Sequence, residues 1–244
     1  MRLWYRICRI GAQALFIGLF RGRVFDARRV PRTGGVLLVC NHQSFFDPIL
    51  ATVALPRECH YMARDSLFRN KWFRKLIESL NAFPVRRGAA DVGAIKETLR
   101  RLKRGALVTV FPEATRTTDG TVRPMQSGVI LIARKARVPL IPTLILGAFE
   151  AWPRHARLPH PAPIIVAYGQ PVTPEQLADL DDQQAIDLLR QRIITLMHDY
   201  RRHPLLRGRL RPLPDQPRTS TRPLVQPGPG LEGQCPPRVR PGDY

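Results

Sequence analysis

The chain has 244 residues, which is enough for one domain with a substantial hydrophobic core. It carries 39 Lys and Arg against 19 Asp and Glu, a formal net charge of +20. This excess favours polyanionic partners, such as a membrane surface, phosphorylated substrates, an acidic protein or nucleic acid. The four cysteines form no Cys-x-x-Cys motif and no His/Cys cluster has metal-ligand spacing, so we expect reduced structural thiols and no metal site.

The N-terminal segment predicts an amphipathic helix over residues 3–20. Arg2, Arg6, Arg9 and Gln13 fall on one face at helical spacing, and apolar side chains cover most of the remainder. The apolar stretch is too short to cross a bilayer, and it lacks the small-residue cleavage site of a signal peptide. We therefore expect residues 1–24 to form a helix that lies in the membrane interface, with its arginines among anionic headgroups. A helix that packs against the domain core is the alternative.

The first chemical motif follows a predicted buried strand over residues 36–40. This strand ends in the sequence NHQSFFDP, which contains His42 and Asp47. Asp47 and the proline after it are typical of a helix start, so the turn can fold the carboxylate back toward the imidazole. A carboxylate that accepts from one ring nitrogen fixes the histidine tautomer and leaves the other nitrogen free as a base. A turn histidine beside a helix-capping aspartate has the same spacing, so this motif alone does not decide between the two.

Strands and helices alternate through the middle of the chain. Apolar runs predict further strands over residues 59–63, 82–86, 106–111, 140–146 and 164–168. Helical patterns cover residues 48–55, 70–80, 91–104, 127–136 and 183–200. This alternation predicts an α/β domain over residues 25–203, with a single mostly parallel or mixed sheet flanked by helices.

A second motif follows the strand at 106–111 and reads FPEATRT over residues 111–117. It presents Glu113 and Arg116 just after the strand. Arginine makes planar, two-pronged contacts to phosphate, and a nearby carboxylate can hold the guanidinium in place or take a substrate hydroxyl. Because the carboxyl ends of parallel strands meet at one edge of a sheet, where open α/β folds bind ligands, we expect the two motifs to converge.

The composition changes after His203. Residues 204–244 are rich in Pro, Arg and Gly and almost lack aromatic residues. Such a segment cannot bury enough apolar surface to offset the entropy of ordering, so we expect a disordered tail.

The two motifs together resemble sequence blocks of the glycerolipid acyltransferases typified by 1-acyl-glycerol-3-phosphate acyltransferase. Two weaker elements occur in the right order: FPVRR, which places Arg87 at the arginine of the family's second block, and VPLIP over residues 138–142, which resembles its fourth. The resemblance covers roughly residues 25–200. In two departures, Ala114 replaces the glycine common in the third block and Arg86 replaces a frequent aspartate of the second. If that glycine needs a positive φ, Ala114 carries strain.

The resemblance implies acyl transfer from acyl-CoA or acyl carrier protein to the hydroxyl of a lysophospholipid. The expected acceptor is 1-acyl-sn-glycerol-3-phosphate, which would give phosphatidic acid in phospholipid biosynthesis without a cofactor. His42 would be the base and Asp47 would orient it, while Glu113, Arg116 and Arg87 would bind the acceptor's phosphate. Backbone N–H groups of residues 44–46 are candidates for the oxyanion site.

A thioester needs no covalent enzyme intermediate, and no G-x-S-x-G motif is present. A Cys40 nucleophile is the mechanistic alternative. The expected partners are anionic lipids at the cytoplasmic face of the cell membrane.

Other functions remain open at this point. Another lysolipid or glycerol-3-phosphate is an alternative acceptor within the same family. A different class is a nucleic-acid-binding protein, which the charge alone favours, although no recognisable binding motif supports specific binding. A third is a membrane adaptor that has lost activity, against which the intact His42–Asp47 pair argues.

Overall fold

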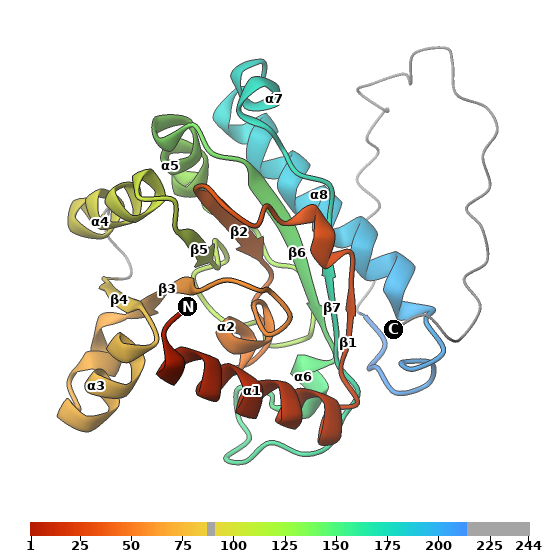
Figure 1. Cartoon of the computed structure of the whole chain (residues 1–244). Coiled ribbons are helices and arrows are strands. Elements are labelled where there is room, and N and C mark those ends of the chain that lie inside the picture. Colours follow the sequence, from red (N-terminus) through yellow and green to blue (C-terminus); the bar gives the residue numbers. More distant parts are fainter. Residues whose placement is uncertain (87–90, 214–244) are drawn as a thin grey trace, which may run out of the picture. The chain divides into compact units, whose positions relative to one another are not determined.

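The computed structural model describes residues 1–86 and 91–213, which form an α/β domain around one seven-stranded mixed sheet (Figure 1). The strand order is β1-β7-β6-β2-β5-β3-β4, and every neighbouring pair is parallel except β6 and β7. The strands are β1 (Arg23–Phe25), β2 (Val36–Cys40), β3 (Cys59–Arg64), β4 (Ala82–Val85), β5 (Leu107–Val110), β6 (Leu140–Leu146) and β7 (Ile165–Tyr168). The predicted fold class is confirmed, and six of these strands lie where the sequence places them; β1 was not predicted.

The helices of the described residues are α1 (Leu3–Gly18), α2 (Asp47–Leu50), α3 (Lys71–Ser79), α4 (Val92–Lys103), α5 (Gly128–Ala136), α6 (Ala148–Ala151), α7 (Pro174–Ala178) and α8 (Asp182–Arg201). Short 3-10 turns occupy Ala27–Arg29 and Asp65–Phe68. The helix expected over residues 48–55 is shorter, because turns follow α2 over residues 51–54. The sequence analysis missed α6 and α7.

Two hydrophobic cores cover the two faces of the sheet. Side chains of a strand alternate between faces, so Leu37 and Val39 of β2 enter one core while Val36, Leu38 and Cys40 enter the other. The first core includes residues of α4, α5 and α8, and the second includes residues of α1, α2 and α6. A sheet buried on both faces explains why its strands read as continuous apolar runs.

The N-terminal helix docks through its polar stripe. The Arg2 side chain bonds to Glu58 and Asn81, an Arg9 guanidinium N–H donates to the Leu55 carbonyl over 2.6 Å, and the Gln13 amide donates to the Val53 carbonyl over 2.9 Å. The outer face is apolar instead. Its exposed large apolar residues are Leu3, Trp4, Ile7, Ile10, Leu15 and Ile17.

The prediction that the arginine stripe faces lipid headgroups is therefore wrong for Arg9, whereas Arg2 bonds to the domain and stays exposed. The helix also has core residues, since Phe16 is buried, which supports the alternative that it packs against the domain core. Contact of its outer face with a membrane stays a prediction. No helix of the described residues has the length and apolarity needed to span a membrane.

The predicted tail starts too early. Residues 204–213 pack against the first core, and Leu206 is only 1% exposed. The Arg211 backbone N–H donates to the Glu150 carboxylate over 3.1 Å. Disorder from residue 204 is thus wrong for these ten residues, and the rest of the predicted tail, 214–244, lies outside the described residues.

Deleting residues 204–244 is expected to destabilise the domain, whereas deleting 214–244 is expected to leave both melting temperature and turnover nearly unchanged. Loss of a buried leucine alone lowers the free energy of unfolding by about 2–5 kcal/mol. Thermal unfolding of the two truncations and of Leu206→Ala, with the exposed Arg207→Ala as control, measures this. Equal melting temperatures for the two truncations would contradict the packing of Leu206.

Candidate active site

The two motifs leave the sheet at the same edge. Strands β2 and β5 are parallel neighbours, with Val39 opposite Val110, so the segments that follow them begin side by side. Two hydrogen bonds join these segments directly: the His42 N–H donates to Glu113 Oε1 over 3.1 Å, and the Thr117 N–H donates to the His42 carbonyl over 2.8 Å. The predicted convergence is confirmed.

Asn41 holds the start of the first motif against the neighbouring strand β6. Its amide donates to the Ile145 carbonyl over 2.9 Å and accepts from the Ile145 N–H over 2.8 Å. This side chain extends the hydrogen bonding between β2 and β6 by one residue after β2 ends. It thereby fixes the backbone position of the next residue, His42. The motif contains Asn41, but the sequence assigns it no such task.

His42 and Asp47 form the predicted pair. The distance from His42 Nδ1 to Asp47 Oδ2 is 2.8 Å, and Asp47 is fully buried at the start of α2. The same oxygen accepts the backbone N–H groups of Gln43 and Ser44, which hold the carboxylate in place. The carboxylate favours the tautomer with the proton on Nδ1, and Nε2 then has a free lone pair. The imidazole also packs on Phe111, with ring centroids 4.5 Å apart.

Cys40 is not placed to act as a nucleophile. It is fully buried among the residues of the second core, and burial raises the pKa of its thiol well above the usual range. The reactive species would be a thiolate, which this environment disfavours. The alternative of a Cys40 nucleophile is therefore wrong.

Glu113 is buried next to the backbone of His42, with 5% of its surface exposed. Burial raises the pKa of Glu113 to about 8, the charge of Asp47 adds to the rise, and the backbone N–H groups of His42 and Arg123 oppose it. In the described part of the chain no salt bridge joins Glu113 to Arg116, and Glu113 Oε2 has no hydrogen-bond partner. The structure shows one contact of Glu113 that bears on the site, with the backbone N–H of His42, and this bond fixes the position of the histidine. A contact of Glu113 with substrate stays a prediction.

Ala114 has the strained backbone that its replacement of a glycine led us to expect. Its φ is +57°, a left-handed conformation in a tight turn where the Ala114 N–H donates to the Phe111 carbonyl over 3.1 Å and the Thr115 N–H donates to the Glu113 carbonyl over 2.7 Å. A residue with a Cβ is less stable there than glycine by roughly 1–2 kcal/mol, part of which the greater flexibility of glycine in the unfolded chain offsets.

Ala114→Gly is therefore expected to stabilise the protein by about 0.5–1 kcal/mol. Ala14→Gly, at an exposed position within α1, is the matched control and is expected to destabilise it by a similar amount. Chemical denaturation of the two variants checks the opposite signs. A loss of stability in Ala114→Gly would show that the turn does not carry this strain.

Arg116 is half-buried near the His42–Asp47 pair and has no ion-pair partner within the residues that the structure describes. Burial lowers its pKa, the positive charge of Arg154 lowers it further, and the charge of Asp47 acts in the opposite direction. Arg154 reaches this neighbourhood because Trp152 packs against Phe45 and Phe46 of the first motif, with ring centroids 5.5 and 4.7 Å apart. Two guanidinium groups thus share one region with little opposing charge, which favours an anionic ligand.

Arg154 is the site residue that the sequence analysis missed. It lies outside both motifs, and only the folding of residues 152–154 over the first motif brings it near. Arg87, the third predicted phosphate ligand, lies outside the described residues.

The backbone donors predicted for the oxyanion are mostly occupied. The Ser44 N–H donates to Asp47 Oδ2, and the Phe46 N–H donates to Ser44 Oγ over 3.4 Å. Of the three, only the Phe45 N–H has no partner among residues 1–86 and 91–213. Phe45 is therefore the remaining backbone candidate from that segment.

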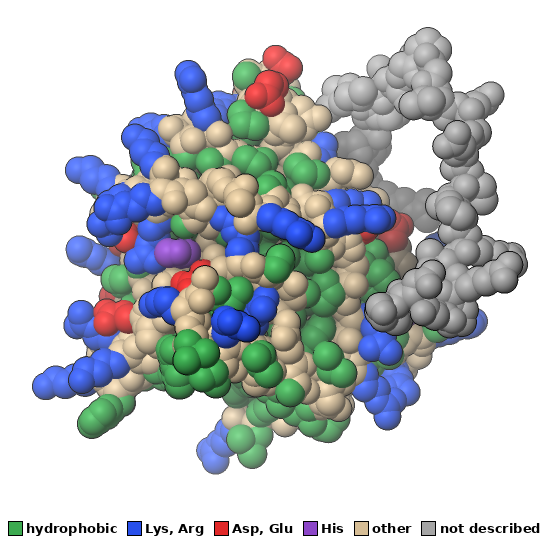
Figure 2. All heavy atoms as spheres, viewed as in Figure 1, with side chains coloured by type: hydrophobic (Ala, Val, Ile, Leu, Met, Phe, Trp, Pro, Cys, Tyr) green, Lys and Arg blue, Asp and Glu red, His purple; other side chains and the backbone are tan. Residues whose placement is uncertain are grey.

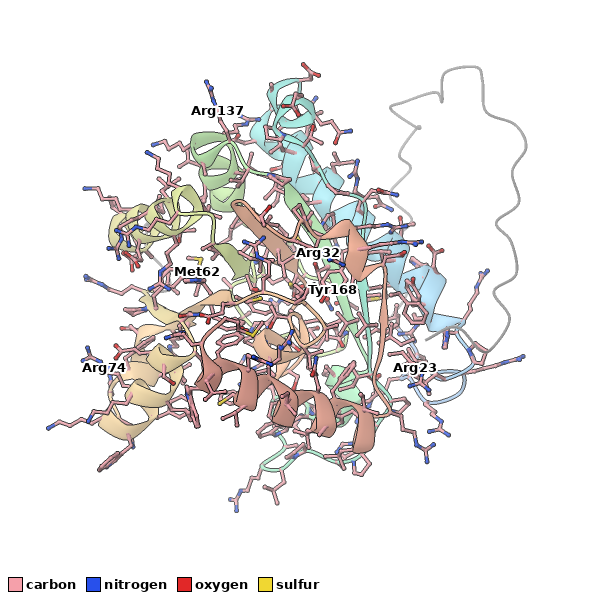
Figure 3. The ribbon with its side chains drawn as sticks, viewed as in Figure 1. Arg23, Arg32, Met62, Arg74, Arg137 and Tyr168 are labelled. Carbon is pink, nitrogen blue, oxygen red and sulfur yellow. The ribbon has the colours of Figure 1, made fainter. Side chains whose placement is uncertain are left out.

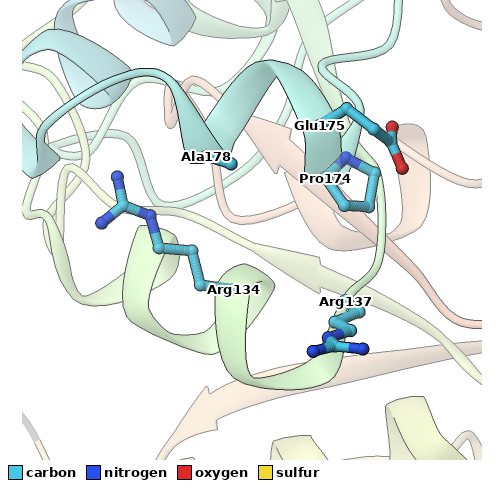
Figure 4. Close-up of a pocket in the computed structure, with 5 residues that line it drawn as sticks. All are labelled: Arg134, Arg137, Pro174, Glu175 and Ala178. Carbon is cyan, nitrogen blue, oxygen red and sulfur yellow. The ribbon is translucent and has the colours of Figure 1, made fainter.

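A hollow of about 450 Å³ lies elsewhere, between α5 and α7 (Figure 4). Arg137, on its rim, lies just before the start of β6, so the hollow is at the amino edge of the parallel strands and away from His42. Its other arginine, Arg134, already pairs with Asp182 over 2.9 Å. The residues of the two motifs therefore lie at the opposite edge of the sheet, where the parallel strands β2 and β5 end.

Comparisons with known proteins show which family the chain belongs to. A family model described as acyltransferase matches residues 21–146, which include both motifs. The chain is 33% identical over 145 residues to a 1-acyl-sn-glycerol-3-phosphate acyltransferase of Bacillus subtilis, a match that covers 59% of this chain and 71% of the relative. A Cocos nucifera protein of the same name is 30% identical over 139 residues, covering 56% of this chain and 45% of the relative.

The fold also matches a crystal structure of the 1-acyl-sn-glycerophosphate acyltransferase PlsC from Thermotoga maritima. The TM-score is 0.71, the sequences are 22% identical, and the match covers 81% of this chain and 80% of the other.

Proposed function

Because the chain belongs to the acyltransferase family and is a glycerolipid acyltransferase, we propose that it transfers an acyl chain from an acyl thioester to 1-acyl-sn-glycerol-3-phosphate, giving phosphatidic acid. The observation that carries this proposal is the His42–Asp47 pair, whose free ring nitrogen lies where the two motifs meet. The names of the relatives support the choice of acceptor. Acyl-CoA and acyl carrier protein present the same thioester, so both remain candidate donors.

In the proposed reaction His42 Nε2 accepts the proton of the acceptor's hydroxyl as its oxygen attacks the thioester carbonyl. Asp47 stabilises the imidazolium that forms, as a buried carboxylate does beside a catalytic histidine. The carbonyl oxygen becomes an oxyanion, for which the Phe45 N–H is a donor. When the tetrahedral species collapses, the C–S bond breaks and the imidazolium returns the proton to the leaving thiolate. No covalent enzyme intermediate is required.

Arg116 and Arg154 are the proposed ligands of the acceptor's phosphate, together with Arg87. A phosphate monoester carries nearly two negative charges at neutral pH, and two arginines match that charge better than one. Glu113 acts in this scheme by holding the backbone of His42.

The purified chain is expected to form phosphatidic acid from 1-acyl-sn-glycerol-3-phosphate and an acyl thioester. Mass spectrometry of the lipids formed from a panel of lysolipids, glycerol-3-phosphate and both donors tests this. If product formed only with another acceptor, the chain would be an acyltransferase for that acceptor and not for 1-acyl-sn-glycerol-3-phosphate. The absence of product with every acceptor and donor would refute the proposed reaction.

We further propose that the enzyme acts at the cytoplasmic face of the membrane, with the exposed apolar face of α1 in the lipid. The polar stripe of this helix is engaged by the domain, so hydrophobic contact, and not charge, is its contribution.

Ile7→Ser and Ile10→Ser are each expected to weaken binding to neutral phosphatidylcholine vesicles by about tenfold. Each removes most of one apolar side chain that the bilayer would bury in the proposed orientation. Leu131→Ser, at an exposed position on α5, is the control and is expected to bind as the parent does. Vesicle co-sedimentation at low and high salt measures the effect, with circular dichroism as the check on folding. Unchanged vesicle binding by both α1 variants would exclude the apolar face of α1 as the membrane contact.

A further inference from the structure

Helix α3 exposes an aromatic and basic surface that the proposed reaction does not use. Trp72 is 81% exposed and Leu76, one turn later, is 43% exposed. Lys71, Arg74 and Lys75 are exposed beside them, with Lys75 Nζ 5.6 Å from the centroid of the Trp72 ring. No residue of α3 is fully buried. We call these five residues the α3 surface; Figure 3 shows Arg74 on the outer side of the helix.

The α3 surface is continuous with the apolar face of α1. The Trp4 indole N–H on α1 donates to Ser79 Oγ on α3 over 3.0 Å. Residues 72, 76 and 79 lie along one side of a helix, because three and four residues separate neighbours on one face. Trp72 and Leu76 therefore extend the exposed stripe that begins on α1. Figure 2 shows apolar side chains below and basic side chains toward the α3 and α4 side of this view.

The charge of the two helices is divided unequally. On α1, Arg2 and Arg9 bond to the domain, which leaves Arg6 as the arginine of the stripe with no such bond within the described residues. On α3 the two lysines have no ion-pair partner in the described part of the chain, and the one pair is Arg74 with Glu78. Tryptophan with lysine at its side is typical of segments that lie at the level of lipid headgroups. Of these two helices, α3 therefore has more positive charge available to anionic lipids.

We propose that the α3 surface binds anionic membrane lipid, with Trp72 and Leu76 at the acyl–headgroup boundary and Lys71 and Lys75 among the headgroups. Helix α1 supplies hydrophobic attachment to any bilayer, and α3 adds the preference for anionic lipid. The inference rests on the proposed membrane location of the enzyme. Its test measures binding without turnover, so a failure of the proposed reaction would be seen separately.

Lys71→Gln/Lys75→Gln in the full chain is the main variant. Each lysine near an anionic surface contributes about a fivefold gain in affinity, so the pair is expected to lose up to about thirtyfold for vesicles of phosphatidylcholine with phosphatidylglycerol. Affinity for pure phosphatidylcholine is expected to stay the same, and the dependence of binding on salt to become weaker. Lys96→Gln/Lys103→Gln on α4 removes the same charge from another exposed helix surface and is expected to bind as the parent does.

Trp72 supplies an independent readout. Brominated phosphatidylcholine in anionic vesicles is expected to quench the fluorescence of the parent more than that of Trp72→Phe. Equal losses in the α3 and α4 double variants would overturn the proposal, because net charge alone would then explain binding. Unchanged vesicle binding in the α3 variant, with a higher KM for an acyl carrier protein donor but not for acyl-CoA, would instead assign this surface to an acidic protein and also overturn it.

Discussion

Replacing His42 with alanine is expected to abolish measurable acyl transfer while the domain stays folded. General base catalysis contributes about 10²- to 10⁴-fold to rate, and neither motif contains a second histidine to replace Nε2. The side chain belongs to neither hydrophobic core, so the domain is expected to stay folded, but it is buried and bonds to Asp47, so the melting temperature is expected to fall. Turnover assays and thermal unfolding of the same preparation separate the two effects.

The exposed His155 lies on the segment that follows Trp152, so His155→Ala is the matched control and is expected to keep normal turnover. Turnover of His42→Ala within tenfold of the parent would exclude His42 as the base. Asp47→Asn is expected to lose a large part of the rate, because a misoriented imidazole is a poor base. It is a less clean probe, since Asp47 also accepts two backbone N–H groups and is buried.

The second large effect is expected at the phosphate site. Arg116→Ala is expected to raise the KM for the acceptor about ten- to a hundredfold, since a lost charged hydrogen bond is worth roughly 1.5–3 kcal/mol. The KM for the acyl donor is expected to change far less. Arg154→Gln is expected to act in the same direction, and more strongly for a phosphate monoester than for a lysolipid whose phosphate is a diester with one negative charge.

Arg157→Gln, an exposed arginine on the same segment as Arg154, is the control and is expected to leave both KM values unchanged. Steady-state kinetics with the acceptor and the donor varied in turn decides the outcome. Equal effects on both substrates would mean that Arg116 is not a dedicated phosphate ligand.

The sequence by itself determined the fold class and the core of the site. Buried parallel strands are apolar throughout, and helices carry a 3.6-residue pattern, so both are visible in local composition. The motifs that contain His42, Asp47, Glu113 and Arg116 each follow such a strand, and parallel strands bring their carboxyl ends to one edge. The strain at Ala114 was predicted from the family resemblance instead, because a glycine common at this position indicates a positive φ.

What the sequence did not determine depends on contacts between distant segments. Strand β1 has three residues and α6 has four, too few to show a period, and each exists because the surrounding structure pairs or packs it. Leu206 becomes a core residue only because residues 204–213 lie against the first core, although their composition resembles that of a tail.

Contacts between distant segments also determine which face of α1 packs against the domain. An amphipathic pattern shows that a helix has two faces but not which of them meets the protein. Carbonyl groups of residues 53 and 55 accept the polar stripe, so the apolar face remains outside. Arg154 joins the site through packing of Trp152 on Phe45 and Phe46, which is a contact between segments more than a hundred residues apart. Such contacts form only when the chain folds, and local sequence patterns do not encode them.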